Sequence, residues 1–519
     1  MLSKYIKRIL SARVYDVAIE TPLDPAPSLS RRLGNTLLIK REDQQPVFSF
    51  KLRGAYNKIA GLNETARRAG VIAASAGNHA QGVALAAKKL GIRALIVMPC
   101  TTPSIKVNAV RNLGGDIVLH GDSYDDAYDH AIALAEAQQL TFIHPYDDPD
   151  IIAGQGTVGM EILRQHHGDI HAIFVPVGGG GLIAGIAAYV KFVRPEIRVI
   201  GVEPDDADCL NRALKANRRV TMKQVGLFAD GVAVKQIGKE TFHIAHQYVD
   251  EVITVSTDEI CAAIKDIFDD TRSVAEPAGA LGVAGAKKYT ERHDLQGQCL
   301  IAIESGANTN FDRLRHIAER AQLGEQQELV IAVTIPERPG SFLDFCTALG
   351  RRSITEFNYR FYDERAAHIF VGIQTSGTDK TALIAGLEQQ GYGVTSMSGN
   401  ELALEHIRYM VGGHAPKHLH EVVYSFEFPE RPGALLRFLT IMSNRWNISL
   451  FHYRNHGAAF GRVLMGVQVP KAERKAFRAF LDEIGFVYRD ETQNPAYRLF
   501  AGGSEASPDR QRPATRESE

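Results

Sequence analysis

The chain reads IFVPVGGGGL from Ile173 to Leu182, an apolar run that ends in four successive glycines. A run that is apolar at every position is typical of a parallel strand buried on both faces. The glycines leave backbone N–H groups open to an anion, at the start of a helix that the pattern from Ile183 to Val190 predicts. One glycine would suffice for a tight turn without a ligand, so four in a row favour a phosphate site.

Short apolar runs of the same kind recur along the first 310 residues and alternate with helical patterns. The sequence Ser256-Thr-Asp-Glu259 is a capping box and predicts the start of one of these helices. The other predicted strands are Val71–Ala74, Ala94–Met98, Ile117–Leu119, Val199–Val202, Val252–Val255 and Leu300–Ile303. This alternation predicts an α/β fold with parallel strands and with ligands at their carboxyl ends.

Composition narrows the class of protein. The 519 residues predict three or four compact units, and the 45% hydrophobic and 23% charged contents are ordinary for a globular protein. A net charge of −1 offers no field for nucleic acid or anionic membranes, so we expect small-molecule ligands. The five cysteines form no C-x-x-C pair, and no apolar run is long enough to span a bilayer, so we expect a cytoplasmic protein.

One lysine lies in unusually apolar company. Lys51 stands between Phe50 and Leu52 in the stretch from Phe48 to Ala55. A desolvated amine has a lowered pKa and can bind a carbonyl cofactor covalently. The alternative is an ordinary lysine that lays its methylenes on an apolar surface and keeps its ammonium in water.

Polar loops follow two more predicted strands. SAGNHAQG runs from Ser75 to Gly82, and SGAN runs from Ser305 to Asn308. Ser305 by itself could equally be a turn or helix cap. The glycines also match the spacing of a dinucleotide-binding fingerprint, with Glu203 as its acid. A nicotinamide-dependent enzyme therefore remains an alternative interpretation of these residues.

Together these four motifs closely resemble the fold-type-II pyridoxal-phosphate enzymes, and among them the biosynthetic threonine dehydratases. The resemblance runs from about Val14 to Phe500 and implies a tryptophan synthase β-like catalytic domain. It implies that Lys51 binds pyridoxal 5′-phosphate covalently, beside Phe50. The remaining implied contacts are Asn78 with the ring 3′-oxygen, Gly178, Gly179, Gly180, Gly181 and Leu182 with the phosphate, Ser305 with the pyridine nitrogen, and Ser75, Gly77 and His79 with the substrate carboxylate.

The resemblance implies deamination of L-threonine to 2-oxobutanoate, by loss of water and then of ammonia, as the first committed step of isoleucine biosynthesis. A neutral serine at the pyridine nitrogen makes the ring a weaker electron sink than an aspartate would, which favours elimination. The alternatives are a serine/threonine dehydratase of broader specificity and, from other classes, the nicotinamide-dependent enzyme and a catalytically silent amino-acid sensor.

We expect no metal site. Related serine racemases can bind a divalent cation through a Glu and a further acid six residues later. Here Glu203 is followed at that distance by Cys209, a poor ligand for hard cations.

The second half of the chain contains an internal repeat. Ile335-Pro-Glu-Arg-Pro-Gly340 returns as Phe428-Pro-Glu-Arg-Pro-Gly433, and each copy precedes an amphipathic helical pattern. The apolar positions of the two helices are Phe342, Phe345, Cys346 and Leu349, and Leu435, Phe438, Leu439 and Met442. Each copy predicts a ferredoxin-like βαββαβ plan that opens with a strand, Leu329–Ile335 or Val422–Phe428.

The repeats resemble ACT-like amino-acid-binding domains, which implies inhibition by isoleucine and relief by valine, with the Pro-Gly turns as the expected effector region. The alternative is that the repeats only pack subunits together. We expect a catalytic domain over 1–322, ACT-like domains over 328–400 and 421–494, a linker over 319–328 and a disordered tail over 502–519. The family implies a homotetramer.

Overall fold

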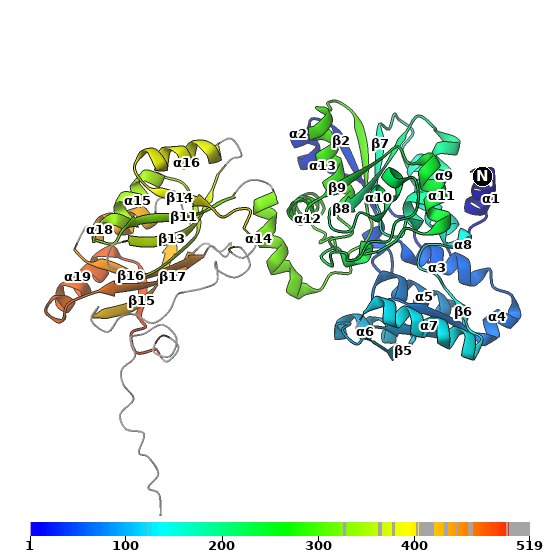
Figure 1. The fold of residues 1–519 in the computed structure, drawn as a ribbon, viewed down its shortest axis with the longest axis horizontal. Helices are drawn as coiled ribbons and strands as arrows, with labels where there is room; N and C mark the ends of the chain where they lie inside the picture. Colours follow the sequence, from blue (N-terminus) through cyan, green and yellow to red (C-terminus); the bar gives the residue numbers. More distant parts are fainter. Residues whose placement is uncertain are drawn as a thin grey trace, which may run out of the picture. The chain divides into compact units, whose positions relative to one another are not determined.

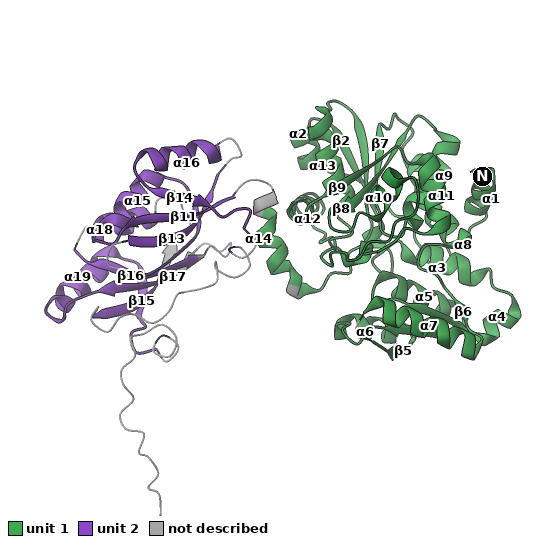
Figure 2. Cartoon of the chain, viewed as in Figure 1, with its two compact units in different colours: residues 1–324 green, residues 325–519 purple. Residues whose placement is uncertain are grey.

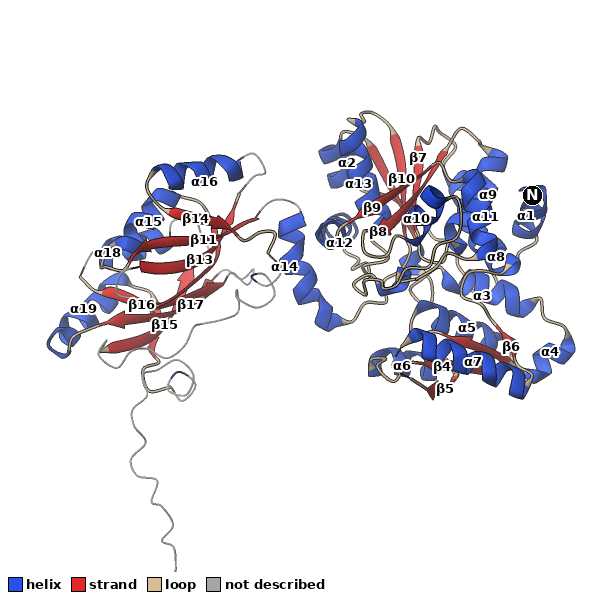
Figure 3. Ribbon diagram, viewed as in Figure 1, coloured by secondary structure: helices blue, strands red, loops and turns tan. Residues whose placement is uncertain are grey.

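The computed structural model describes residues 2–121, 123–324, 328–361, 366–375, 379–400, 403, 420–429, 434–442, 445–454, 460–494 and 497. The chain divides into two compact units, Met1–Gly324 and Glu325–Glu519 (Figures 1 and 2). The first unit contains two sheets and the second contains one (Figure 3). Length alone predicted three or four compact units, but the structure has two. The two sheets of the first unit belong to one compact body, and the two repeats of the second unit share one sheet.

The larger sheet of the first unit has six strands in the order β1-β2-β10-β7-β8-β9. All neighbours are parallel except β1 and β2. The bounds are β1 Leu23–Pro25, β2 Thr36–Arg41, β7 Ala172–Pro176, β8 Arg198–Pro204, β9 Glu251–Val255 and β10 Cys299–Glu304. The predicted parallel strands in this region are therefore confirmed, and the carboxyl ends of β7 and β10 lead into the glycine loop and into Ser305.

The smaller sheet has four parallel strands in the order β5-β4-β3-β6. Their bounds are β3 Val71–Ala74, β4 Ala94–Met98, β5 Asp116–Leu119 and β6 Thr141–Phe142. Successive side chains of β3 point to opposite faces. Val71 and Ala73 pack with helices α3 and α5, whereas Ile72 and Ala74 pack with α7. Burial on both faces explains why these strands are continuously apolar.

Helices cover both faces of each sheet. On the six-stranded sheet one core joins the strands to α2, α12, α13 and α14, and the opposite core joins them to α8, α9, α10 and α11. Ser256 caps α12 through the predicted capping box. The helices of this unit are α1 Leu2–Leu10, α2 Pro27–Leu33, α3 Lys51–Ala60, α4 Glu64–Ala69, α5 Asn78–Leu90, α6 Ser104–Asn112, α7 Tyr124–Gln138, α8 Pro149–Gln165, α9 Gly181–Val193, α10 Cys209–Ala216, α11 Lys239–Tyr248, α12 Thr257–Thr271, α13 Leu281–His293 and α14 Leu314–Gly324.

The second unit has the predicted pair of βαββαβ modules. The first module is β11 Glu328–Pro336, α15 Ser341–Leu349, β12 Ile354–Arg360, β13 Ala366–Gln374, α16 Asp379–Gln389 and β14 Gly393–Ser396. The second module is β15 Glu421–Pro429, α18 Ala434–Met442, β16 Asn447–Arg454, β17 Phe460–Gln468, α19 Arg474–Ile484 and β18 Val487–Asp490. The two predicted helix faces are buried or partly buried in one shared core.

The modules are joined edge to edge. β12 pairs with β16 in antiparallel register, from Glu356 opposite Arg454 to Arg360 opposite Leu450. The result is one eight-stranded sheet in the order β14-β11-β13-β12-β16-β17-β15-β18. Pairing satisfies an edge of each module that would otherwise be exposed, which is why the two repeats form a single unit.

The linker prediction is partly wrong. Residues 319–324 are the end of α14, whose Ile317 and Ala321 pack against the core that contains α12. The second Pro-Gly turn, most of 401–419 and the tail 502–519 lie outside the described residues. Within the described part of the chain no helix is both long and apolar enough to cross a membrane.

Candidate active site

Lys51 is the first residue of α3. Its Nζ donates to the carbonyl of Pro145 at 3.2 Å and lies 5.3 Å from the centre of the Phe50 ring. Burial lowers the pKa of the Lys51 amine to about 8, and the opposing influence of Glu276 is smaller. A partly neutral amine next to an aromatic ring suits covalent binding of an aldehyde.

A buried network of charges holds the first turn of α3. Arg53 binds Glu42 at 2.7 Å and Glu161 at 2.5 Å, and Lys40 binds Glu161 at 2.6 Å. All four side chains are fully buried. Two cations and two anions balance, and the network ties α3, the helix that Lys51 begins, to β2 and α8.

The glycine loop turns its carbonyl groups towards the protein. The carbonyl of Gly178 accepts from the Cys209 thiol at 3.4 Å, and that of Gly179 accepts from Thr241 Oγ1 at 2.7 Å. Among the described residues, none accepts a hydrogen bond from the N–H groups of Gly179, Gly180, Gly181 or Leu182. These donors form an open cradle at the N-terminus of α9, and a phosphate fits such a cradle.

Packing requires the same glycines. A Cβ at Gly179 would lie 2.2 Å from the Tyr146 ring, and one at Gly178 would lie 2.9 Å from Val232 Cα. Gly180 has φ +91°, in the region that favours glycine. The glycine run therefore serves two needs, because protein atoms fill the Cβ side and the N–H side stays open.

Asn78 is the first residue of α5, and the loop before it is tightly turned. Gly77 N–H donates to Ser75 Oγ at 3.2 Å. A Cβ at Gly77 would meet nothing within 4 Å, so the loop borders open space there. Free N–H groups at the start of α5 suit a carboxylate.

His79 is more restricted than the sequence suggested. Its ring is 4% exposed, and Nε2 lies 2.8 Å from the carbonyl of Ile143. Burial lowers the pKa of His79 to about 3, with Lys51 adding to the effect, so the ring is neutral and donates its one proton to Ile143. The His79 side chain has no N–H left for a substrate, and only its backbone can serve as a donor.

Ser305 lies next to Lys51 in space. The Phe50 N–H donates to the Ser305 carbonyl at 3.3 Å, and Ser49 forms a β-bridge with Gly306. The Ser305 side chain is buried, and its hydroxyl approaches the Ala278 carbonyl at 3.4 Å, a long contact. A neutral hydroxyl with so weak a partner suits a pyridine nitrogen.

Sequence reasoning missed Glu276. Its buried carboxylate accepts from Asn78 Nδ2 at 2.6 Å. Burial raises the pKa of Glu276 to about 7, and Asp230 adds to this. The available signal was a single acid within the apolar stretch Val274-Ala-Glu-Pro-Ala278. Asn308 was seen only as part of a motif, yet it binds Asn78 at 2.7 Å.

Glu203 does not behave as the acid of a dinucleotide site. It is fully buried, and its oxygens accept from the backbone N–H groups of Leu210 at 2.8 Å and Asn211 at 2.9 Å. The first turn of α10 thus occupies the acceptors that a ribose would need. The hypothesis of a nicotinamide-dependent enzyme relied on a free acid at Glu203, and these hydrogen bonds argue against it.

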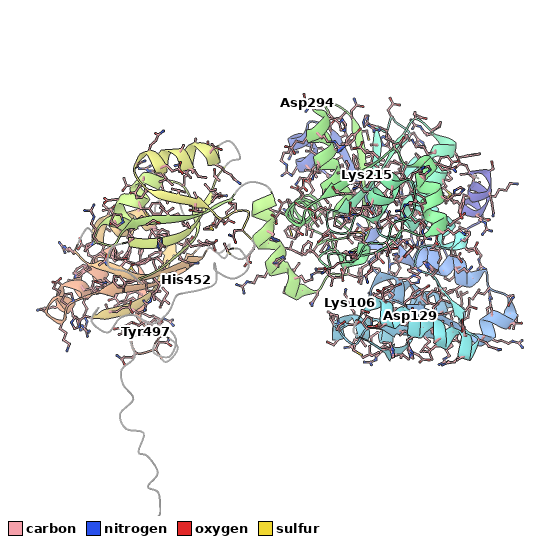
Figure 4. All side chains as sticks on the ribbon, in the orientation of Figure 1. Lys106, Asp129, Lys215, Asp294, His452 and Tyr497 are labelled. Carbon is pink, nitrogen blue, oxygen red and sulfur yellow. The ribbon has the colours of Figure 1, made fainter. Side chains whose placement is uncertain are left out.

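Two ion pairs link the small sheet's helices to the segment that follows α10. Lys106 of α6, labelled in Figure 4, binds Asp230 at 2.6 Å, and Lys235 binds Asp125 at 2.6 Å. Asp230 belongs to a short 3₁₀ turn, Asp230–Val232, that lies against Glu276 and Gly178. The turn therefore contacts both the glycine loop and Glu276, and it is bonded to α6 on the smaller sheet.

The second unit has a separate cavity of about 490 Å³. Glu337 lies in it, accepting from Tyr359 Oη and from Asn447 Nδ2 at 2.7 Å, while Glu473 accepts from Trp446 Nε1 at 2.9 Å. Burial raises the pKa of Glu337. The lining residues come from both modules and are Glu337, Pro339, Phe361, His420, Arg445, Trp446, Asn447, Gln468, Pro470 and Glu473.

Comparison with known families covers nearly the whole chain. Residues 14–305 match the family described as pyridoxal-phosphate dependent enzyme. Residues 319–407 and 412–501 match the C-terminal regulatory domain of threonine dehydratase.

Individual relatives agree with these matches. The L-threonine dehydratase biosynthetic IlvA of Burkholderia multivorans is 58% identical over 96% of this chain and 99% of its own length. The protein of the same name from Escherichia coli is 53% identical over 96% of this chain and 98% of its own length. The processed form of threonine deaminase isoform 2 from Solanum lycopersicum is 51% identical, with a TM-score of 0.61 over 62% of this chain and 93% of that structure.

Proposed function

We propose residue roles and an effector site for this chain from the premise that it belongs to the family of biosynthetic L-threonine dehydratases. It is a pyridoxal-phosphate-dependent lyase that converts L-threonine to 2-oxobutanoate and ammonia, the committed step towards isoleucine. Its C-terminal unit is the family's regulatory domain.

Lys51 is the central catalytic residue. Its Nζ would hold the cofactor, and its free amine would take the proton from Cα of threonine. Burial supports both roles, because a pKa of about 8 leaves a useful fraction of the amine neutral near neutral pH. The cofactor supplies an electron sink for the electrons left at Cα.

The residues around Lys51 would bind and orient the cofactor and the substrate. The N–H groups of Gly178–Leu182 would hold the cofactor phosphate, Phe50 would lie beside the cofactor, Asn78 would donate to the ring 3′-oxygen, and Ser305 would contact the ring nitrogen. Ser75, Gly77 and His79 would bind the substrate carboxylate, Ser75 through its hydroxyl, because its backbone N–H already donates to Val97, and Gly77 and His79 through their backbone N–H groups. Because Ser305 is neutral, the cofactor it holds would supply a weaker electron sink than one held by an aspartate, which would favour elimination of the β-hydroxyl.

The observation that carries this assignment is the desolvated amine of Lys51, which donates to the Pro145 carbonyl and follows Phe50, whose N–H donates to the Ser305 carbonyl. The test is Lys51→Ala. We expect loss of turnover, loss of the visible absorption of bound cofactor, and no borohydride-fixed adduct at this position. Wild-type turnover in the alanine variant would refute the role of Lys51.

We propose that the 490 Å³ cavity binds the aliphatic amino-acid effectors, isoleucine as inhibitor and valine as activator. Glu337 and Glu473 offer acceptors for the ammonium group, and Arg445 offers a cation for the carboxylate. Pro339, Phe361 and Trp446 offer an apolar wall for the side chain. The mixture of charges and apolar surface matches a zwitterion with an aliphatic tail.

Trp446 is the one tryptophan of the chain, so its fluorescence reports on this cavity. We expect isoleucine to change the Trp446 emission over the same concentration range in which it inhibits turnover. Glu337→Gln should weaken both effects together. Trp446→Phe is the control that identifies the source of the signal, and inhibition without any emission change would place the effector elsewhere.

We further propose the domain boundaries 1–322, 328–400 and 421–494, and a cytoplasmic homotetramer. The division of the compact units after Gly324 supports the first boundary. Light scattering on the purified chain tests the number of subunits.

A further inference from the structure

Three polar side chains from distant parts of the chain form one line beside Lys51. Asn308 lies in the loop after β10, Asn78 begins α5, and Glu276 lies between α12 and α13. Asn308 Nδ2 donates to Asn78 Oδ1 at 2.7 Å, and Asn78 Nδ2 donates to Glu276 Oε1 at 2.6 Å.

The orientation of the Asn308 amide is determined by an unambiguous partner. Its Nδ2 also donates to the backbone carbonyl of Val47 at 2.8 Å, and a carbonyl can only accept. Both hydrogens of the Asn308 amide are therefore used, one on Val47 and one on Asn78.

The hydrogen bond from Asn308 Nδ2 also fixes the orientation of the Asn78 amide. Because Asn308 presents a donor, Asn78 must present its oxygen to it and its nitrogen to Glu276. A flipped Asn78 amide would place Nδ2 against Nδ2 of Asn308, two donors face to face, whatever the protonation of Glu276. One N–H of Asn78 remains free to donate to a ligand, while Oδ1 is held towards Asn308.

Gly306 makes room for Glu276. A Cβ at Gly306 would lie 2.7 Å from Glu276 Oε1. The Glu276 N–H also donates to the Gly306 carbonyl at 3.0 Å. The loop that carries Ser305 and Asn308 is thereby bonded to Glu276 through both backbone and side chains.

We propose that Asn308 and Glu276 are positioning residues that hold Asn78 as an obligate hydrogen-bond donor towards the cofactor. This rests on the proposed contact of Asn78 with the ring oxygen and deepens it. An obligate donor stabilises that oxygen in its ionised form, whereas an Asn78 free to flip would present its own oxygen for part of the time.

The test is the absorption spectrum and the cofactor dissociation rate of the holoenzyme, measured for a set of variants. Glu276→Gln retains an acceptor and should keep the wild-type spectrum. Glu276→Met has similar length but no acceptor. We expect it to shift the visible band and to speed cofactor dissociation roughly tenfold, as expected for losing one hydrogen bond to a charged acceptor. Asn308→Ala should cause the same shift of the visible band and the same faster dissociation. Because Asn308 is only half-buried, this variant replaces Glu276→Met if Glu276→Met folds poorly.

A double-mutant cycle shows whether the effect passes through Asn78. In an Asn78→Ala background, Glu276→Met and Asn308→Ala should change the spectrum and the dissociation rate no further. Additional changes of the single-variant size in that background would overturn the proposal. A wild-type holoenzyme without a visible band would instead refute the proposed function, so the two failures are distinct.

Discussion

From the lowered pKa of Lys51 we predict how the rate of covalent cofactor attachment depends on pH. Only the neutral amine attacks an aldehyde, so the attachment rate follows the neutral fraction. Burial of the amine disfavours the ammonium form and lowers the pKa from 10.5 to about 8. The perturbation is a change of pH during the addition of pyridoxal phosphate to the apoenzyme.

The magnitude follows from the two pKa values. At pH 7.5 about a quarter of an amine with a pKa of 8 is neutral, against about a thousandth for a lysine with its ordinary pKa. Lys51 should therefore capture the aldehyde roughly 200-fold faster than an exposed lysine of equal intrinsic reactivity. The rate should rise about tenfold per pH unit up to pH 7, bend near pH 8 and level off above pH 9.

Stopped-flow absorption of the bound cofactor measures this rate directly. The same experiment with pyridoxal, which has no phosphate to titrate, separates the ionisation of the protein from that of the ligand. A blocked lysine peptide in solution provides the unburied reference. If the rate with apoenzyme still climbs tenfold per unit between pH 9 and 10, the amine is not desolvated and the argument fails.

Three substitutions test the surroundings of Lys51. Arg53→Met strands the buried Glu42 carboxylate, and we expect the catalytic unit to lose about 3–5 kcal/mol, seen as a lower urea midpoint; an unchanged midpoint would contradict this. Gly179→Ala drives a Cβ into the Tyr146 ring, 2.2 Å away, so we expect about 1–3 kcal/mol of overpacking and weaker cofactor retention in equilibrium dialysis. Gly77→Ala points into open space, so it should preserve the fold and the cofactor spectrum but raise the KM for threonine severalfold; an unchanged KM would place the substrate elsewhere.

The sequence by itself determined most of the parallel strands and the residues that we propose for the cofactor site. Continuous apolar runs predicted the buried parallel strands because burial on both faces leaves no polar position, and the capping box at Ser256 predicted the start of α12. Lys51, the glycine loop and Ser305 could be found because each is a local signal, written within a few adjacent residues. The repeated Pro-Glu-Arg-Pro-Gly segment likewise predicted two modules.

Only the tertiary structure decided which distant groups meet. Glu276 lies 198 positions from Asn78 in the chain, and no local pattern links the two. The same holds for the bond that occupies the His79 ring and for the pairing of β12 with β16 that joins the repeats into one sheet. Hydrophobic periodicity and backbone turns are properties of neighbouring residues, whereas burial, donor orientation and pKa depend on atoms that folding brings together from across the chain.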